Sequence, residues 1–193
     1  RNWGWVRLSH RDRRELPLRI GSVRLWQQLD QRLAGQTGYR QSGATYICAS
    51  DSILEREVIW QQQLAEHGVP TRILDAAEVH SAFPGLRGSI KGALHNPQDG
   101  RAEPQWAAPA IAEGARAAGA TVITACAVRS LDLEAGRVAG VVTEKGRVKC
   151  GAVLLAGGAW SRLFAGNADT WLPQLKVRNT VMRTTPVDGP ETS

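Results

Sequence analysis

The stretch Val153-Leu154-Leu155-Ala156-Gly157-Gly158-Ala159-Trp160-Ser161 decides the fold of this 193-residue chain. An apolar run leads into small residues and then into a sequence suited to a helix start. Small residues at the carboxyl end of a strand let a ligand approach the backbone, and the ligand crevice of an open α/β sheet lies at such ends. A plain strand-to-helix turn that needs glycine for its geometry explains the same residues, so the stretch alone leaves both interpretations open.

The sequence before this stretch has the pattern of a nucleotide-binding sheet. Pro104 suits the first turn of an alanine-rich helix that closes at Gly119. Residues 121–128 and 148–155 are continuous apolar runs, separated by a predicted two-stranded excursion. Continuous apolar strands beside a helix imply a parallel sheet that is covered on both faces. Residues from about 100 to 165 are therefore expected to form a doubly wound parallel α/β sheet.

Residues from about 20 to 95 follow a different pattern, in which capped helices alternate with short strands. Ser52-x-x-Glu55 and Asp75-x-x-Glu78 are predicted capping boxes at two helix starts. Residues 44–49 and 90–95 are predicted strands, and the mixture predicts an antiparallel α+β layer. The expected fold class is α/β plus α+β, with part of a Rossmann-like parallel sheet joined to an antiparallel domain.

Composition narrows the function classes. The net charge is +6, but the basic residues are scattered rather than gathered on a face with aromatic partners, so no nucleic-acid partner is expected. No apolar run approaches the ~20 residues that a membrane span needs. The three cysteines and four histidines show no metal spacing, so no metal site is expected. An odd cysteine count fits a reducing compartment, and the cytoplasm is the expected location, with the inner face of the membrane as the alternative.

The motif Ala156-Gly157-Gly158-Ala159-Trp160-Ser161 resembles the second dinucleotide-side motif of the D-amino-acid oxidase superfamily. That group includes glycine oxidase, sarcosine oxidase and D-amino-acid dehydrogenase, and its pattern is an apolar strand followed by Ala-x-Gly-Ala-Trp-Ser. Three further segments are similar to the family in order and spacing: residues 1–7, 97–104 and 114–146. The chain is therefore identified as an internal piece of an FAD-dependent amine or amino-acid oxidoreductase.

The resemblance implies four successive parts. The first is a flavin-proximal segment of the FAD domain (residues 1–19), and the second is the first part of the substrate-binding domain (20–97). The third is the middle of the FAD domain (98–170), and the last is a return to the substrate-binding domain (171–193). The family's GxGxxG loop for the FAD pyrophosphate does not occur in this sequence, nor does the family's final third. The catalytic residues are therefore expected outside this chain, which alone should neither hold FAD tightly nor turn over amino acids.

The resemblance also implies contacts with FAD. They are expected along the flavin ring, on the adenine side and near the pyrophosphate and ribitol, at Asn2, Gly4, Trp5, Val128, Ala156, Gly157, Gly158 and Trp160. Val128 should end one parallel strand and lie beside the Ala156-Gly157-Gly158 turn at the end of the next. A core role is the alternative for Val128 and for Trp160.

Candidate substrate contacts are Arg7, Tyr46 and His95. A guanidinium can bind a substrate carboxylate through two hydrogen bonds, although a solvated Arg7 explains the sequence as well. His95 also fits a strand-end histidine whose ring is satisfied locally.

The resemblance implies oxidation of a C–N bond next to a carboxylate or carbonyl, with a small-molecule amine or amino acid as the substrate. Hydride passes from the substrate α-carbon to flavin N5, water hydrolyses the imine, and the protein supplies orientation. The sequence leaves open whether the parent protein contacts a membrane or an electron acceptor and whether it forms an oligomer. The alternative function is a non-catalytic assembly module or subunit derived from this fold.

Overall fold

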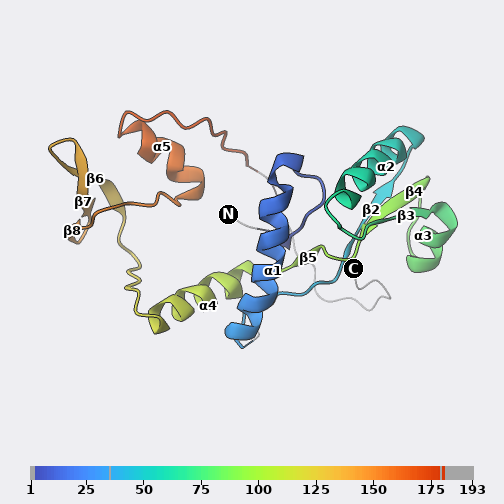
Figure 1. Cartoon of the computed structure of the whole chain (residues 1–193), viewed down its shortest axis with the longest axis horizontal. Helices are drawn as coiled ribbons and strands as arrows, with labels where there is room; N and C mark the ends of the chain where they lie inside the picture. Colours follow the sequence, from blue (N-terminus) through green and yellow to red (C-terminus); the bar gives the residue numbers. More distant parts are fainter. Residues whose placement is uncertain (1–2, 35, 179, 181–193) are drawn as a thin grey trace. The chain divides into compact units, whose positions relative to one another are not determined.

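The computed structural model describes residues 3–34, 36–178 and 180, which fall into two compact units. The larger unit contains residues 3–120 and the smaller one residues 121–180 (Figure 1). Asn2, one of the predicted FAD contacts, lies outside the described residues, as do residues 181–193 of the predicted return to the substrate-binding domain.

Helices and short strands alternate along the larger unit. In chain order they are β1 (Trp5–Val6), the 3-10 turn η1 (Arg13–Glu15), α1 (Leu16–Arg32), β2 (Ala44–Cys48), α2 (Asp51–Ala65), β3 (Arg72–Asp75), α3 (Ala76–Ala82), β4 (Gly92–Asn96), β5 (Gly100–Arg101) and α4 (Pro104–Ala117). No helix among the described residues is both long and apolar enough to cross a membrane.

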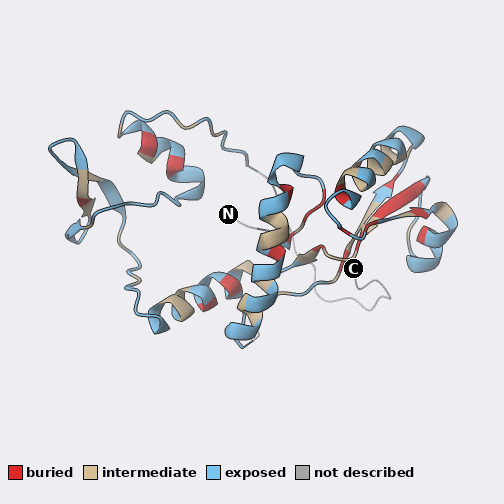
Figure 2. Cartoon of the chain, viewed as in Figure 1, coloured by how far each residue is buried: buried red, intermediate tan, exposed pale blue. Residues whose placement is uncertain are grey.

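The sheet of the larger unit is antiparallel, in the strand order β2–β4–β3. On one face, Leu74 and Ala93 pack with Val79 of α3. On the other, a side chain at Gly92 would meet Leu54 of α2. The two helices therefore cover opposite faces, and the buried residues of β4 lie between them (Figures 1 and 2). This arrangement confirms the predicted antiparallel layer with helices.

One predicted helix cap is confirmed and the other is wrong. Asp75 accepts from the Glu78 N–H at 2.8 Å while the Glu78 carboxylate accepts from the Asp75 N–H at 2.9 Å, which is a complete capping box. The helix α2, by contrast, is capped by Ser50, whose hydroxyl accepts from the Ile53 N–H. Ser50 is the last residue with extended backbone, so the helix begins at Asp51 and Ser52 already lies in its first turn.

The main core joins segments that are far apart in the sequence. It contains buried residues from β1, α1, α2 and α4 and from the stretches beside them: Val6, Leu8, Leu16, Val23, Leu64, Val69, Ala102 and Ala107. Leu16 and Val23 are seven residues apart, so both lie on the same side of α1. The segment that follows β1 is therefore anchored inside the larger unit.

The smaller unit contains a three-stranded antiparallel meander and a short helical end. Its elements are β6 (Val128–Glu134), β7 (Arg137–Thr143), β8 (Gly146–Lys149), the 3-10 turn η2 (Gly158–Trp160) and α5 (Ser161–Gly166). Ala135 and Gly136 connect β6 to β7, both with positive φ, which is the geometry of a tight hairpin whose twist matches the strands.

The predicted parallel sheet is not formed by the described residues. Residues 121–127 and 150–157 belong to no strand, and Val128 begins the antiparallel strand β6, opposite Thr143, instead of ending a parallel one. The physical reason is that an apolar run becomes a strand only beside a partner that satisfies its N–H and C=O groups. Residues 153–155 remain exposed in the smaller unit, with Leu154 at 91%.

Candidate functional site

Gly4 and Trp5 lie in the larger unit, where β1 pairs with β5 and Trp5 stands opposite Arg101. The Ala102 N–H donates to the Gly4 carbonyl at 2.8 Å. Gly4 has a φ of +84°, and a Cβ there would lie 2.1 Å from the Ala102 carbonyl oxygen. Glycine is therefore required by the fold at this position, whatever else it contacts.

A mostly apolar cavity of about 250 Å³ opens beside this segment. Its walls come from β1, α1, β5 and α4 and their flanks, through Gly4, Trp5, Val6, Trp26, Ala102, Pro104, Ala107, Ala108 and Ile111. Trp5 is 54% exposed. The predicted flavin-proximal segment therefore offers an accessible apolar surface against which a planar ring can pack.

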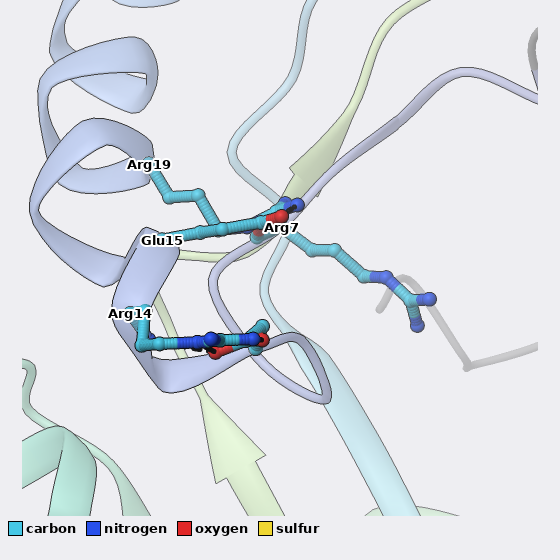
Figure 3. Close-up of polar contacts among 5 residues, drawn as sticks. Arg7, Arg14, Glu15 and Arg19 are labelled. Carbon is cyan, nitrogen blue, oxygen red and sulfur yellow. Dashed lines mark hydrogen bonds and ion pairs between the residues drawn. The ribbon is translucent and has the colours of Figure 1, made fainter. Parts of the chain in front are cut away.

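Arg7 follows β1 and places its guanidinium carbon 4.7 Å from the centroid of the Trp5 ring, within range of a cation–π interaction. Figure 3 shows its side chain pointing away from the Glu15–Arg19 ion pair, whose atoms are 2.5 Å apart. Among the described residues the buried Arg7 Nε has no hydrogen-bond partner, and the guanidinium forms no ion pair. Arg7 is therefore a half-buried cation whose charge no described carboxylate neutralises by contact.

Tyr46 on β2 is tied to a fully buried carboxylate, Asp99. The Tyr46 hydroxyl donates to Asp99 Oδ2 at 2.8 Å, while Asp99 Oδ1 accepts from the Leu8 N–H at 2.6 Å and from Asn96 Nδ2 at 3.0 Å. Burial, and after it the charge of Asp99, raise the pKa of Tyr46 far above its ordinary value, and Arg7 lowers it by less. Tyr46 therefore keeps its proton and remains a fixed donor to Asp99.

His10 covers the same tyrosine. Its ring lies edge-on to Tyr46, with centroids 4.2 Å apart, and roughly parallel to Trp60 at 6.3 Å. His10 Nε2 also lies 2.7 Å from a carboxylate oxygen of Glu57 on α2. The segment after β1 is thus held against the sheet by aromatic and polar contacts, which bring Arg7 and Tyr46 to one place.

His95 lies on the opposite face of the sheet. It stands across from Thr45 while Tyr46 stands across from Leu94, and successive residues of a strand face opposite ways. The Thr45 hydroxyl lies 3.0 Å from His95 Nδ1, and both residues line an open cavity of about 600 Å³ that Arg72 also borders. Burial, followed by the charge of Arg72, lowers the pKa of His95, so the ring is neutral at pH 7. The structure does not bring Tyr46 and His95 together.

The predicted glycine turn lies in the smaller unit. Gly158 opens η2 with a φ of +55°, and no atom lies within 4 Å of the position that a Cβ would take there. The Trp160 N–H donates to the Gly157 carbonyl at 3.1 Å, and Gln174 Nε2 donates to the Gly158 carbonyl at 3.0 Å. Trp160 is 55% exposed. The turn leaves room for a ligand to approach its backbone, as a cofactor contact requires. Val128, 44% exposed, belongs to the same unit.

Sequence reasoning missed Asp99, Asn96 and His10. The pair Asp99-Gly100 is a turn signal, and a turn aspartate usually faces solvent. Its burial depends on Leu8 and Tyr46, which are 91 and 53 residues away along the chain. No local pattern in the sequence carries that information.

Comparisons with known proteins identify the family of this chain. The sequence model of the FAD-dependent oxidoreductase family, abbreviated DAO, matches residues 1–193. Mitochondrial sarcosine dehydrogenase from Mus musculus is 27% identical over 167 residues, which cover 83% of this chain and 18% of that protein. The mitochondrial pyruvate dehydrogenase phosphatase regulatory subunit of the same organism is 27% identical over 141 residues, covering 72% of this chain and 16% of that protein.

A solved structure is also similar to this chain. The L-amino acid deaminase from Proteus myxofaciens, in complex with anthranilate, superposes with a TM-score of 0.83 at 29% identity over 90% of this chain and 40% of that chain. The chain thus spans about a fifth of the curated relatives and two fifths of the solved structure. Because the family model matches every residue, the chain belongs to the FAD-dependent oxidoreductase family.

Proposed function

We propose that the full-length protein uses FAD to oxidise the C–N bond of an amino acid or a secondary amine. The observation that carries the proposal is the cluster around Arg7, in which a half-buried cation lies against an indole ring and beside a half-buried tyrosine. Sarcosine and amino acids, the substrates in the names of two similar proteins, both carry a carboxylate next to the reacting carbon. When bound, FAD would supply the redox chemistry as the acceptor of the hydride that leaves the α-carbon, and water would hydrolyse the imine product.

In this proposal Arg7 binds the substrate carboxylate. A guanidinium presents several N–H donors in one plane and matches a carboxylate with two parallel hydrogen bonds. The Trp5 ring on one side and the hydroxyl of Tyr46 on the other limit the positions that the guanidinium can take. Tyr46 can accept a hydrogen bond from the substrate amine, because its own proton is donated to Asp99.

Contacts with FAD are proposed at the positions that the family resemblance indicates: Asn2, Gly4, Trp5, Val128, Ala156, Gly157, Gly158 and Trp160. The open backbone at Gly158 and the accessible Trp5 ring support them. We also propose that residues 121–127 and 150–155 are strands of a parallel sheet in the full-length protein. Their exposed apolar residues, such as Ile123 and Leu154, support this because neighbouring strands and helices would cover them. The four-part division at residues 19, 97 and 170 remains part of the proposal.

A non-catalytic assembly role is the second candidate, because a phosphatase regulatory subunit is among the similar proteins. Under both candidate functions, His95 lies apart from the cluster around Arg7. It lines the open cavity on the other face of the sheet, and the proposal that it contacts a small-molecule ligand rests on that cavity.

The test uses purified full-length protein and a panel of sarcosine, glycine, L-proline, L-phenylalanine and D-alanine. Flavin absorbance establishes whether FAD is bound, and its loss under anaerobic conditions reports reduction by each amine. Reduction by at least one member is expected. A protein that holds no FAD, or whose FAD none of these amines reduces, favours the assembly role.

The role of Arg7 is tested with R7M, which keeps an unbranched apolar stem and removes the charge. Charge-assisted hydrogen bonds contribute about 1.5–3 kcal/mol, so KM for the amino acid should rise about 10- to 100-fold. The control is R14M, because Arg14 pairs with Asp12 on the exposed turn η1. R14M should leave KM unchanged, and an R7M enzyme with the parental KM would exclude Arg7 as the carboxylate ligand.

A further inference from the structure

Asp99 joins three stretches of the larger unit at one buried point. Its carboxylate accepts from the backbone N–H of Leu8, from the Tyr46 hydroxyl on β2 and from the side chain of Asn96 on β4. Asn96 Nδ2 also lies 3.0 Å from the hydroxyl of Ser9, and Leu8, Ser9, Asn96 and Asp99 are all fully buried. Two of the connected residues, Leu8 and Ser9, directly follow Arg7 in the chain.

The side-chain and backbone donors to the Asp99 carboxylate within the described residues are all neutral. A buried carboxylate is costly unless hydrogen bonds satisfy it, and here three neutral donors do so. No cation among the described residues forms an ion pair with Asp99. The carboxylate oxygens are thus occupied without an ion pair to Arg7, and the buried Arg7 Nε has no hydrogen-bond partner among the described residues.

Asp99 also acts on Arg7 from two directions. Its bond to the Leu8 N–H fixes the backbone one residue beyond Arg7, and its bond to Tyr46 fixes the phenol beside the guanidinium. Tyr46 links the two charges, because its O–H donates to the Asp99 carboxylate and its oxygen interacts with the Arg7 guanidinium. Each contact of the phenol polarises it in the sense that favours the other. The result is a cation that is held in place without an ion pair to any carboxylate in the described part of the chain.

We propose that Asp99 is a positioning residue that orients Arg7 for the substrate carboxylate, acting through the Leu8 amide and the Tyr46 hydroxyl. The inference rests on the proposed function of Arg7 and goes one step beyond it. Asp99 itself touches no substrate, so its loss should weaken recognition of the carboxylate more than any other property of the site.

The experiment compares two substrates in the full-length holoenzyme: the amino acid of the panel that reduces FAD fastest, and the carboxamide of the same amino acid. The ratio of their kcat/KM values measures recognition of the carboxylate. D99N keeps the size and removes the charge, and it should lower this ratio about 3- to 10-fold, with the loss falling on KM more than on kcat. R7M should bring the ratio close to one.

The matched control is D30N. Asp30 accepts from the Thr37 hydroxyl elsewhere in the larger unit, so D30N should lower the melting temperature and leave the ratio unchanged. If D99N behaves in the same way, Asp99 has a structural role only and the proposal is overturned. If D99N does not fold, Y46F decides. Tyr46 gives its one proton to Asp99 and a carboxylate only accepts, so Y46F removes no donor that the substrate carboxylate uses.

The outcomes separate the two proposals. A parental ratio in R7M refutes the role of Arg7. A ratio that collapses in R7M but stays parental in D99N, or in Y46F where D99N does not fold, refutes the positioning role of Asp99 and leaves that of Arg7 intact. A reduced ratio in D99N or Y46F together with a parental ratio in D30N supports the proposal.

Discussion

Replacement of Gly4 by alanine should destabilise the larger unit through two separable effects. With its φ of +84°, Gly4 has a left-handed backbone, which costs an L-residue about 1–2 kcal/mol. The new Cβ would also lie 2.1 Å from the Ala102 carbonyl oxygen, and a backbone atom cannot rotate away as a flexible side chain can. Moving it apart loosens the bond from the Ala102 N–H to the Gly4 carbonyl, which contributes about 0.5–1.5 kcal/mol.

Gly68 supplies the matched control. It follows α2 with a φ of +71°, but no atom lies within 4 Å of its Cβ position. G68A therefore carries the backbone cost alone, about 1–2 kcal/mol, while G4A carries about 2–3 kcal/mol from both effects. At about 2–4 °C per kcal/mol for domains of this size, the melting temperature should fall by about 4–12 °C in G4A and by about 2–8 °C in G68A.

The assay is thermal unfolding of the full-length protein by circular dichroism, with flavin absorbance after gel filtration as the second readout. Equal losses of melting temperature in G4A and G68A would refute the close approach of Gly4 to Ala102. Full flavin retention in G4A would refute the proposed contact of Gly4 with FAD, and it would leave the stability argument untouched.

Three further predictions follow from caps, burial and charge. S50A should lower the free energy of unfolding by about 1 kcal/mol because it removes the cap of α2. S52A should change it by less than about 0.5 kcal/mol, and urea titration measures both values. A larger loss in S52A than in S50A would show that Ser52 is the cap, as the sequence predicted. Burial raises the pKa of Cys48, so a thiol reagent at pH 8 should label the partly exposed Cys150 and spare Cys48 until the protein is unfolded, as peptide mass spectrometry will show. Burial and a nearby positive charge lower the pKa of His95, so the neutral ring stabilises the fold fully above pH ~6.5, and this contribution is lost as pH falls through the lowered pKa. From pH 7 to pH 5 the melting temperature of the parent should therefore fall more than that of H95Q. Equal falls in both proteins would contradict the lowered pKa.

Features with local causes could be predicted from the sequence. The capping box at Asp75 depends on a side chain three residues away, and the strands of the antiparallel layer alternate with helices short enough to connect them. Even there, two serines spaced by two residues compete for the same role at α2. The choice of Ser50 depends on where the backbone leaves the extended conformation, which the residue types do not specify.

Features with distant causes could not be predicted. Residues 121–127 and 150–155 belong to runs with the composition of buried strands, yet a strand also needs a neighbour, and the described residues pair with neither segment. The candidate site also depends on a contact between residues that are distant in the sequence. Arg7 and Tyr46 could be named as polar residues on suitable segments, but the link between them is Asp99, whose partners lie 53 and 91 residues away.

The alternation of side chains along a strand separates the two halves of the predicted substrate site. Tyr46 and His95 lie on opposite faces of one sheet, so a small substrate cannot contact both.

Charge distinguishes the two faces of this sheet. The arginine beside His95 is Arg72, and it is already paired with Glu78 at 2.8 Å. The arginine beside Tyr46 is Arg7, which forms no ion pair within the described part of the chain. A guanidinium is a strong ligand for a carboxylate, so we expect the carboxylate of the proposed substrate to bind on the face of Tyr46. A ligand beside His95 would have to be recognised by other chemistry, for which a neutral imidazole and the Thr45 hydroxyl supply the hydrogen-bonding groups.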